Sequence, residues 1–213
     1  MPRIRPLDRG RSTLDSYIRR VLRTCERVEQ GLARGSLLVT DVELVYSSGF
    51  LSIVTRWEAF LEDSLYESVC GVAPGKLVAR RNVIVPSRSR LERILLHPNH
   101  EYIQLTTVKQ AESLYDLFLK NSGPFGSVSA PNRTYLQQAI YIRNAIAHSS
   151  ASATIRFRDG VPGVTALPSN RQTPGAFLRH IFRQSPSQRR LELYCAAFLS
   201  AAGEMNEGWA AAS

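Results

Sequence analysis

The fold is decided by the stretch DVELVYSSGFLSIVTRWEAFLEDSLYESVCG, residues Asp41 to Gly71. Its apolar residues return every three or four positions, which is the spacing of one face of an α-helix. Seven residues share that face: Tyr46, Phe50, Ile53, Trp57, Phe60, Leu61 and Leu65. Gly71 and Pro74 supply the signal that ends the helix. We therefore expect one long helix whose aromatic side chains belong to the core of a bundle.

A second amphipathic helix is predicted ahead of this stretch. Its apolar residues alternate at spacings of four and three: Leu14, Ile18, Val21, Cys25, Val28 and Leu32. We expect it to end between Gly31 and Gly35, because glycine favours helix ends. The first ten residues, MPRIRPLDRG, hold two prolines and three arginines. We expect a flexible basic arm over 1–10 and, since no apolar run follows its charges, no signal peptide.

Shorter elements are expected in the middle of the chain. Leu77–Pro86 is either a short strand or an extended connection. Ser87 introduces a short helix, which Pro98 stops. A further helix is capped by Thr106 or Thr107 and closed by Gly123 and Pro124.

The next helix begins at Pro131, a residue suited to a first turn, and runs to about His148. Thr154–Gly160, TIRFRDG, alternates like a strand that leads into a turn. Residues 161–175 form a proline-rich loop, and Ser185-Pro186 starts a final helix. Its apolar side holds Leu191, Tyr194, Cys195, Phe198, Leu199, Ala202 and Met205.

These elements predict an all-α fold, a helical bundle with elaborated loops and a short β-element after the helix that ends near His148. At 213 residues the chain is long enough to bury a core without disulfides. We expect a single domain over 11–213, with a core over 14–150 and a C-terminal elaboration over 151–213.

The chain is basic, with a formal charge of +9. It has 27 basic residues, of which Lys76, Lys109 and Lys120 are the lysines, which leaves 24 arginines. The arginine fork suits phosphate better than the lysine ammonium does, so the composition fits a nucleic-acid partner. A GC-rich genome, whose codon composition favours Arg over Lys, explains the same composition equally well.

Several classes of protein are excluded. No apolar run approaches the roughly 18 residues that cross a bilayer, so we expect no membrane association. The three cysteines, Cys25, Cys70 and Cys195, are odd in number and far apart, which indicates neither a zinc site nor a disulfide framework. His97 and His100 flank a proline like loop residues. We expect no metal, no cofactor and a cytoplasmic location.

Charge is distributed unevenly along the chain. Residues 1–34 hold nine arginines against four acids, whereas the long second helix holds six acids against Arg56. The simplest expectation is that these two helices form an ion-paired surface inside the bundle. The remaining positive charge lies on the arm, over Arg80–Arg93 and in the C-terminal third, where RNA would be met.

The segment YIRNAIAHSS, Tyr141 to Ser150, contains the candidate catalytic residues. Arg143 can grip phosphate oxygens, His148 can exchange a proton near neutral pH, and Asn144 can orient either of them. Arg and His at similar spacing occur twice more, at Arg90–His97 and Arg93–His100, and about 1.4 such matches are expected by chance. The Tyr141–Ser150 match is distinguished by its Asn, by the alanine before His148 and by its unbroken helix.

RNAIAH, Arg143 to His148, resembles the R-N-x-x-A-H form of the R-x(4–6)-H motif of HEPN-domain ribonucleases. RWEAFLEDSL, Arg56 to Leu65, resembles the glutamate-bearing helix of the RiboL-PSP branch of that superfamily, and the resemblance covers about Leu14 to Ser150. It implies a HEPN-like bundle, a homodimer around a two-fold axis and a metal-independent endoribonuclease that leaves a cyclic phosphate. It also implies toxin–antitoxin or anti-phage defence, with an antitoxin or regulatory protein as partner.

The resemblance also implies roles for individual residues. Arg143 would bind the scissile phosphate, His148 would be the general acid and base, and Asn144 would orient the pair. Glu58 would be a supporting acid. Arg133, Arg80 and Arg81 are expected to bind RNA together with Arg143. Some family members add a tyrosine just after the motif histidine, and this chain has Ser149 and Ser150 there.

Helix geometry bears on the dimer. Arg143 and His148 lie roughly 140° apart around an ideal helix, whereas Asn144 and His148 share a face. Either the helix bends or unwinds near His148, or two copies of the helix meet in a shared cleft.

Other interpretations stay open. Arg143 can be paired with an acid of the second helix, His148 can be a polar helix end, and Glu58 can be half of a buried ion pair. The alternative function is a non-catalytic HEPN-like module that binds RNA or a partner protein. A metal-dependent nuclease has little support, because the acids of the second helix have no His or Asp at ligand spacing.

Overall fold

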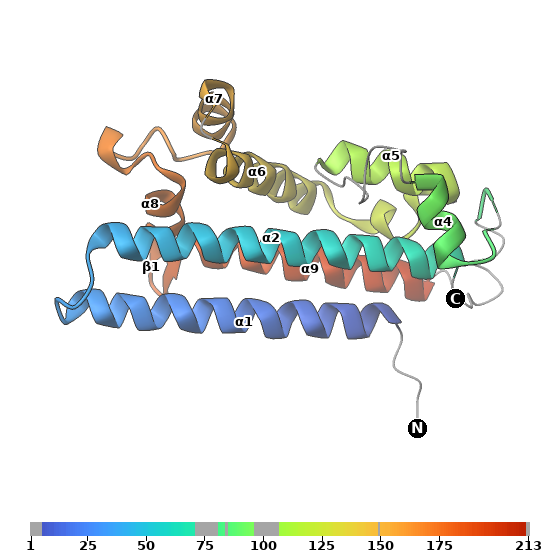
Figure 1. Ribbon diagram of the computed structural model, residues 1–213, viewed down its shortest axis with the longest axis horizontal. Coiled ribbons are helices and arrows are strands. Elements are labelled where there is room, and N and C mark those ends of the chain that lie inside the picture. Colours follow the sequence, from blue (N-terminus) through green and yellow to red (C-terminus); the bar gives the residue numbers. More distant parts are fainter. Residues whose placement is uncertain (1–5, 71–80, 84, 96–106, 149, 212–213) are drawn as a thin grey trace. The chain divides into compact units, whose positions relative to one another are not determined.

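The computed structural model describes residues 6–70, 81–83, 85–95, 107–148 and 150–211 (Figure 1). The described residues are mainly helical, and their one sheet is the two-stranded β1–β2, so the expected all-α fold with a short β-element is confirmed. In chain order the elements are α1 (Pro6–Ala33), α2 (Val39–Cys70), α4 (Arg88–Leu95), α5 (Val108–Phe118), η1 (Lys120–Ser127), α6 (Ala130–Ala147), α7 (Ala151–Gly160), η2 (Ser169–Arg171), α8 (Pro174–Arg179), β1 (Ile181–Gln184), β2 (Ser187–Arg189) and α9 (Arg190–Ala211).

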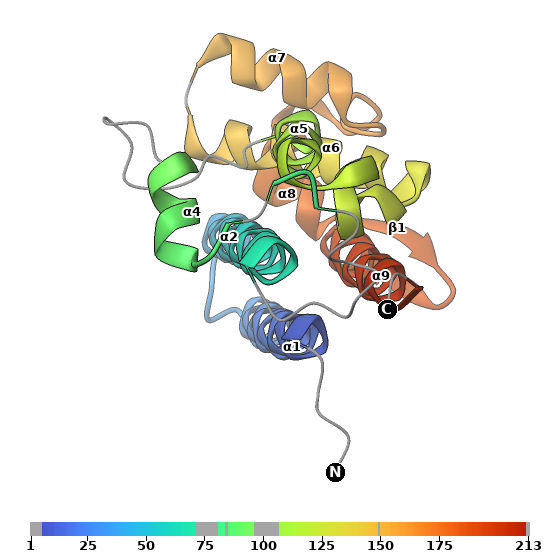
Figure 2. The same cartoon turned by 90° about the vertical axis from the view of Figure 1, so that its right-hand side faces the viewer.

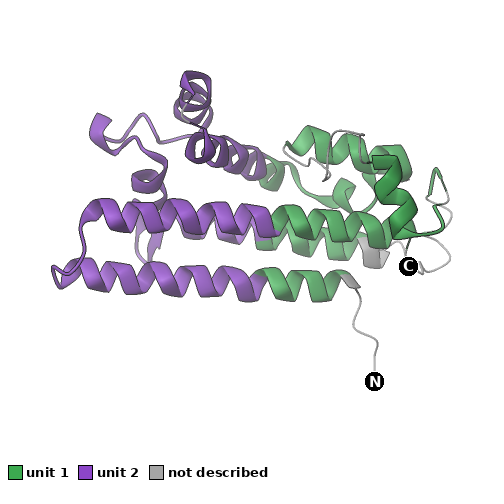
Figure 3. Ribbon diagram, viewed as in Figure 1, with its two compact units in different colours: residues 1–14, 57–133, 199–213 green, residues 15–56, 134–198 purple. Residues whose placement is uncertain are grey.

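The chain divides into two compact units (Figure 3). Unit 1 contains residues 1–14, 57–133 and 199–213, and unit 2 contains residues 15–56 and 134–198. The four long helices α1, α2, α6 and α9 each contribute one part to each unit. The motif helix α6 belongs to unit 2 over nearly all of its length, so unit 2 is the part that holds Arg143, Asn144 and His148.

In unit 2, α1 and α2 form an antiparallel hairpin (Figures 1 and 2). The two helices approach closely at Gly49, where an added Cβ would lie 2.7 Å from a methyl carbon of Val21. Ile18, Cys25 and Tyr46 are buried, as their helical spacing predicts. The turn between the helices uses a left-handed residue at Gly35, with φ +73°, which glycine adopts without a side-chain clash.

A network of aromatic rings around Tyr194 of α9 joins the elements of unit 2. The ring of Tyr194 lies 5.9 Å from Phe50 of α2, 6.1 Å from Tyr135 of α6 and 6.4 Å from Phe177 of α8, between ring centroids. Phe177 in turn meets Phe157 of α7 edge to face at 5.6 Å. The buried hydroxyl of Tyr194 also donates a hydrogen bond to Oε1 of Gln138 on α6, at 3.0 Å. Rings from five helices therefore fix α6 in unit 2.

Unit 1 has its own buried contacts. The hydroxyl of Tyr115 on α5 donates to the carbonyl of Leu61 on α2 at 2.8 Å, and its ring stacks on Phe125 at 5.5 Å. Arg88 of α4 lies over the ring of Tyr66 and pairs with Asp63 of α2 at 3.2 Å. These contacts attach α4 and α5 to the second half of α2.

Several predicted boundaries are confirmed. The long second helix runs from Val39 to Cys70, and the face predicted to be apolar is buried along it. Thr107 caps α5, since its hydroxyl accepts the amide hydrogen of Gln110 at 3.0 Å. Pro131 lies in the first turn of α6. Pro74, Thr106 and Pro98 lie outside the described residues.

Three expectations about secondary structure are wrong. Residues 6–10, expected in the arm, begin α1, because Leu7 is buried on its apolar face and Pro6 costs no hydrogen bond in a first turn. Thr154–Gly160 is helix rather than strand. Ala153 and Phe157, one helical turn apart, are buried there, while the intervening Ile155 is half exposed.

The third wrong expectation concerns the last helix. Ser185 and Pro186 form the turn of a β-hairpin, in which Gln184 pairs with Ser187, and α9 begins only at Arg190. Two residues between paired positions are the shortest common hairpin connection. Of Leu77–Pro86, the described part contains a single β-bridge between Arg81 and Leu119.

The hydrogen bond of Tyr194 provides a test of the ring network. We expect Tyr194→Phe to lower the free energy of unfolding by about 1–3 kcal/mol, because Oε1 of Gln138 loses its donor in a buried site. The matched control is Tyr17→Phe on α1, a half-buried tyrosine, for which we expect a change within about 0.5 kcal/mol. Chemical denaturation followed by circular dichroism measures both. Equal losses in the two variants would contradict the role of Tyr194.

Candidate functional site

The predicted motif residues lie at the C-terminal end of α6. This helix ends at Ala147, and α7 begins at Ala151. The hydroxyl of Ser150 caps α7 by accepting the amide hydrogen of Ala153 at 3.3 Å. His148 thus lies at the start of a short link between two helices, with its side chain exposed to solvent.

The structure brings Arg143 and Asn144 together. Nη1 of Arg143 donates a hydrogen bond to Oδ1 of Asn144 at 3.0 Å, and both residues are half-buried. As far as unit 2 is described, no carboxylate forms an ion pair with Arg143. The neighbouring amide therefore steadies the guanidinium without neutralising it, which leaves its positive charge available to an anion.

His148 keeps the helical phase of α6. Its amide donates to the carbonyl of Asn144 at 2.9 Å, the i to i−4 bond of an α-helix. Arg143 and His148 therefore remain roughly 140° apart around the axis, while Asn144 and His148 lie on one side. The described backbone of α6 does not unwind before His148, so an unwound helix end does not bring Arg143 and His148 together. One copy of the helix presents Arg143 and His148 in different directions.

Helix α7 packs back against α6 beside the link. The ring of Tyr141 lies directly over Gly160, where an added Cβ would come within 2.7 Å of a ring carbon. Phe157 fixes the same helix by its contact with Phe177. Gly160 thus permits the close approach of α7 to the helix that carries the motif.

The other predicted site residues are placed differently. Glu58 is half-buried on the part of α2 that belongs to unit 1, and its supporting role stays a prediction. Arg81 donates from Nε to the carbonyl of Ser68 at 3.0 Å. Arg80 lies outside the described residues, as do His97 and His100.

Arg133 is engaged inside unit 1. Nη1 pairs with Glu112, Nε donates to the carbonyl of Val128 at 2.8 Å, and Nη2 donates to the carbonyl of Phe125 at 3.2 Å. The guanidinium also lies over the ring of Phe125. This geometry favours a structural role for Arg133 and gives no support to its predicted contact with RNA.

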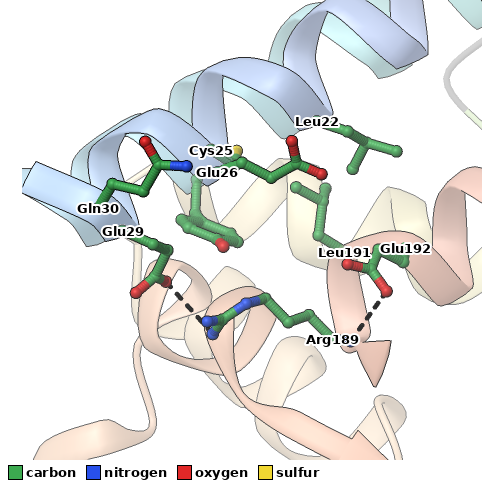
Figure 4. A pocket seen from close by; sticks show the side chains of 9 residues that line it. Leu22, Cys25, Glu26, Glu29, Gln30, Arg189, Leu191 and Glu192 are labelled. Carbon is green, nitrogen blue, oxygen red and sulfur yellow. Dashed lines mark hydrogen bonds and ion pairs between the residues drawn. The ribbon is translucent and has the colours of Figure 1, made fainter. Parts of the chain in front are cut away.

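Unit 2 contains a cavity of about 440 Å³ that the sequence did not indicate (Figure 4). It is lined by Leu22, Cys25, Glu26, Glu29, Gln30, Tyr46, Arg189, Leu191 and Glu192. Three carboxylates face one guanidinium, so the lining repels phosphate. The cavity is therefore unsuited to RNA.

Glu29 holds the wall of this cavity together. Its carboxylate pairs with Arg179 at 2.8 Å and with Arg189 at 3.2 Å. Burial acts to raise the pKa of the Glu29 carboxyl, but the hydrogen bond and charge of Arg179 and the charge of Arg189 outweigh burial, and the pKa lies below its ordinary value. The cluster joins α1 to α8 through Arg179 and to the β1–β2 hairpin through Arg189.

Among the described residues, no three His, Cys, Asp or Glu side chains are grouped so that they could hold a metal ion. The three cysteines are free thiols. Within the same residues, no helix combines the length and the apolar character needed to cross a membrane.

Comparison with protein-family models, with curated proteins and with solved structures found no match. Membership of the HEPN superfamily therefore remains a prediction from the motif residues.

The Glu29 cluster provides a test by pH. We expect Glu29→Gln to lower the free energy of unfolding by about 2 kcal/mol at neutral pH, because two guanidinium groups lose a charged acceptor. The folded pKa is depressed, so this contribution is complete above the ordinary pKa of 4.5 and disappears as the pH falls through the folded value. Urea unfolding of both proteins from neutral to acidic pH measures it.

The matched control is Glu26→Gln, since Glu26 lines the same cavity and, in the described part of the chain, forms no ion pair. We expect this change to stay within about 0.5 kcal/mol at every pH. A difference between wild type and Glu29→Gln that persists at acidic pH would contradict the assignment.

Proposed function

We propose that the protein is a metal-independent endoribonuclease of the HEPN type, with Arg143, Asn144 and His148 at its active site. The observation that carries the proposal is the Arg143–Asn144 hydrogen bond, which lies one helical turn before an exposed histidine. An arginine that is held by a neutral amide, and has no acid of its own in the described part of unit 2, is suited to an anionic substrate.

The reaction uses the 2′-hydroxyl of RNA as its nucleophile. A general base removes the hydroxyl proton, the 2′-oxygen bonds to the adjacent phosphorus, and the bond from phosphorus to the 5′-oxygen breaks. A general acid delivers a proton to the departing 5′-oxygen. The products are a 2′,3′-cyclic phosphate and a 5′-hydroxyl end, and DNA is resistant because it lacks the 2′-hydroxyl.

The three side chains supply what this reaction needs. His148 is the proton-transfer group, since imidazole changes charge near neutral pH. Arg143 stabilises the extra negative charge that develops on the phosphorane oxygens. Asn144 is a positioning residue that holds the guanidinium of Arg143 through Oδ1. Glu58 is assigned a supporting acidic role on the strength of the resemblance alone.

The active form is a homodimer with the ends of two α6 helices at its two-fold axis. The roughly 140° between Arg143 and His148 supports this arrangement, because one helix does not direct both side chains to one phosphate. An isologous interface brings both sets of residues into one cleft and supplies one histidine for the base and one for the acid. Ala147 is exposed and small, which allows the helices to approach.

The biological setting follows from the resemblance and is part of the proposal. Uncontrolled RNA cleavage in the cytoplasm stops growth, which suits a toxin or an anti-phage effector held in check by an antitoxin or regulatory protein. Growth arrest on expression, relieved by His148→Ala, is the simplest sign of this activity.

We expect His148→Ala to lower RNA cleavage about 1000-fold and Arg143→Ala about 100-fold or more, since each removes a group that acts on the reacting atoms. The assay contains a metal chelator and detects the cyclic phosphate. Arg171→Ala, at an exposed arginine of unit 2, is the matched control and should retain full activity. Cleavage that survives both motif substitutions would overturn the proposal. Salt-dependent binding without cleavage by the wild type would instead establish the non-catalytic module.

The shared cleft has a test of its own. Two differently tagged chains, one wild type and one His148→Ala, are coexpressed and the heterodimer is purified through both tags. If both histidines serve one cleft, we expect the heterodimer to lose nearly all activity. Two independent sites would leave it half the activity of the wild type, and that result would exclude the shared cleft.

A further inference from the structure

The first helix exposes a row of arginines in unit 2. Arg20, Arg23 and Arg27 lie on α1, and Arg34 follows its last residue; all four are exposed. The amide of Arg34 donates to the carbonyl of Gln30 at 3.2 Å, so the helical phase continues to this residue. We name these four residues the arginine stripe.

The arginine stripe faces away from the interior of the unit. With 100° between successive residues, its members fall within roughly 60° of one another around the axis. Ile18 and Cys25, which are buried against the rest of unit 2, lie roughly on the opposite side. The expectation that the basic first helix pairs with the acidic second helix is therefore wrong for the arginine stripe.

The charges of the stripe are not neutralised. In the described part of unit 2, none of its members forms an ion pair with a carboxylate. Arg27 uses its guanidinium within the helix, on the carbonyl of Arg23 at 3.3 Å and on the hydroxyl of Thr24 at 3.2 Å. Both partners are neutral, so the four positive charges persist.

Two acids of the same helix in unit 2 are paired with arginines outside the stripe. Asp15 pairs with Arg19 at 2.9 Å, and Glu29 pairs with Arg179. Glu26 lines the cavity of Figure 4 together with Glu29. Glu26 is exposed and lies one helical turn from Arg23, but in the described part of unit 2 no ion pair joins it to the stripe, so the positive charges of the arginines remain in excess.

We propose that the arginine stripe binds the sugar–phosphate backbone of base-paired RNA and so holds the substrate of the proposed ribonuclease. This inference rests on the proposed function and adds the surface by which RNA is held. Arg20 and Arg34 are roughly 21 Å apart along the axis at a rise of 1.5 Å per residue, which spans several phosphates of one strand. Arginine can grip each phosphate through two N–H groups.

Two features favour paired RNA over other polyanions. Single strands are held largely by aromatic side chains on which bases stack, and the one aromatic residue of α1, Tyr17, is half-buried and lies on a different side from the stripe. Helices that lie on membranes insert an apolar face, whereas the apolar face of α1 is buried in the protein. A straight row of cations matches the regular backbone of a duplex.

The test measures RNA binding in the His148→Ala background, which prevents cleavage. Arg20, Arg23, Arg27 and Arg34 are replaced together by Gln, and the probe is an RNA duplex longer than the stripe. We expect binding at low salt to weaken about 100-fold and the slope of log K against log salt to fall by about 3, because each lost phosphate contact removes close to one released ion. Replacement of the four by Lys should preserve the charge and most of the binding.

A charge-matched variant is the control. Arg90, Arg93, Arg171 and Arg183 are exposed, lie outside α1 and belong to the segments in which the sequence alone placed RNA. Their replacement by Gln removes the same charge and compares the two candidate surfaces. If the stripe is the binding surface, this variant should weaken binding only about threefold. Equal losses in the two fourfold variants would overturn the proposal, because they would show diffuse attraction. The proposal would also be overturned if the wild type bound the unpaired strand as tightly as the duplex. The same holds if the stripe variant lost binding to vesicles of phosphatidylcholine and phosphatidylserine but kept its binding to the RNA duplex. Circular dichroism verifies the fold of each variant.

Failure of this inference and failure of the proposed function give different results. If the stripe substitutions leave RNA binding intact while His148→Ala abolishes cleavage, the proposed ribonuclease activity is supported and the proposed role of the arginine stripe is wrong. If the stripe substitutions abolish RNA binding while the His148→Ala protein still cleaves RNA, the arginine stripe is supported as the RNA-binding surface and the assigned active site is wrong.

Discussion

The ring of Tyr194 is the contact on which the arrangement of unit 2 depends. It touches rings from α2, α6 and α8, and its hydroxyl binds Gln138 on α6. Aromatic pairs of this kind add to the free energy of burial and are directional, so they fix both distance and angle. The end of α6, with Arg143, Asn144 and His148, extends from the part of the helix that this network holds. The polar motif is therefore positioned by contacts that α6 makes two or three helical turns closer to its N-terminus.

Much of the fold was predictable because its signals are local. The aromatic face of α2, the cap at Thr107 and the proline in the first turn of α6 each act over a few residues, and a single sequence displays them. The errors arose where local and tertiary preferences differ. Thr154–Gly160 alternates like a strand, yet the burial of Phe157 against Phe177 selects a helix. The hairpin at Ser185 has no hydrophobic pattern to reveal it, since its strands are mostly exposed.

The candidate site was predictable in part for the same reason. Arg143 and Asn144 are neighbours, so a hydrogen bond between them needs no knowledge of the fold. The ion-pair partners of Arg133 and of Glu29 lie from about 20 to 160 residues away, and no spacing rule points to them. The charge balance of the first two helices was misleading because net charge does not say which face of a helix an arginine occupies. Burial decides that, and it directs the arginine stripe outward.

The close contact of Gly160 with Tyr141 has a consequence for how this sequence can change over evolutionary time. The contact binds the far end of α7 to α6, while Ser150 fixes its near end, so the segment between Tyr141 and Gly160 forms a closed structural loop. An insertion or deletion there would shift His148 relative to Arg143, or would separate the ring from the glycine. Natural variants should therefore preserve the length of this segment. Residues 162–172, which lie between the C-cap of α7 at Val161 and the N-cap of α8 at Thr173, can vary in length without moving the motif.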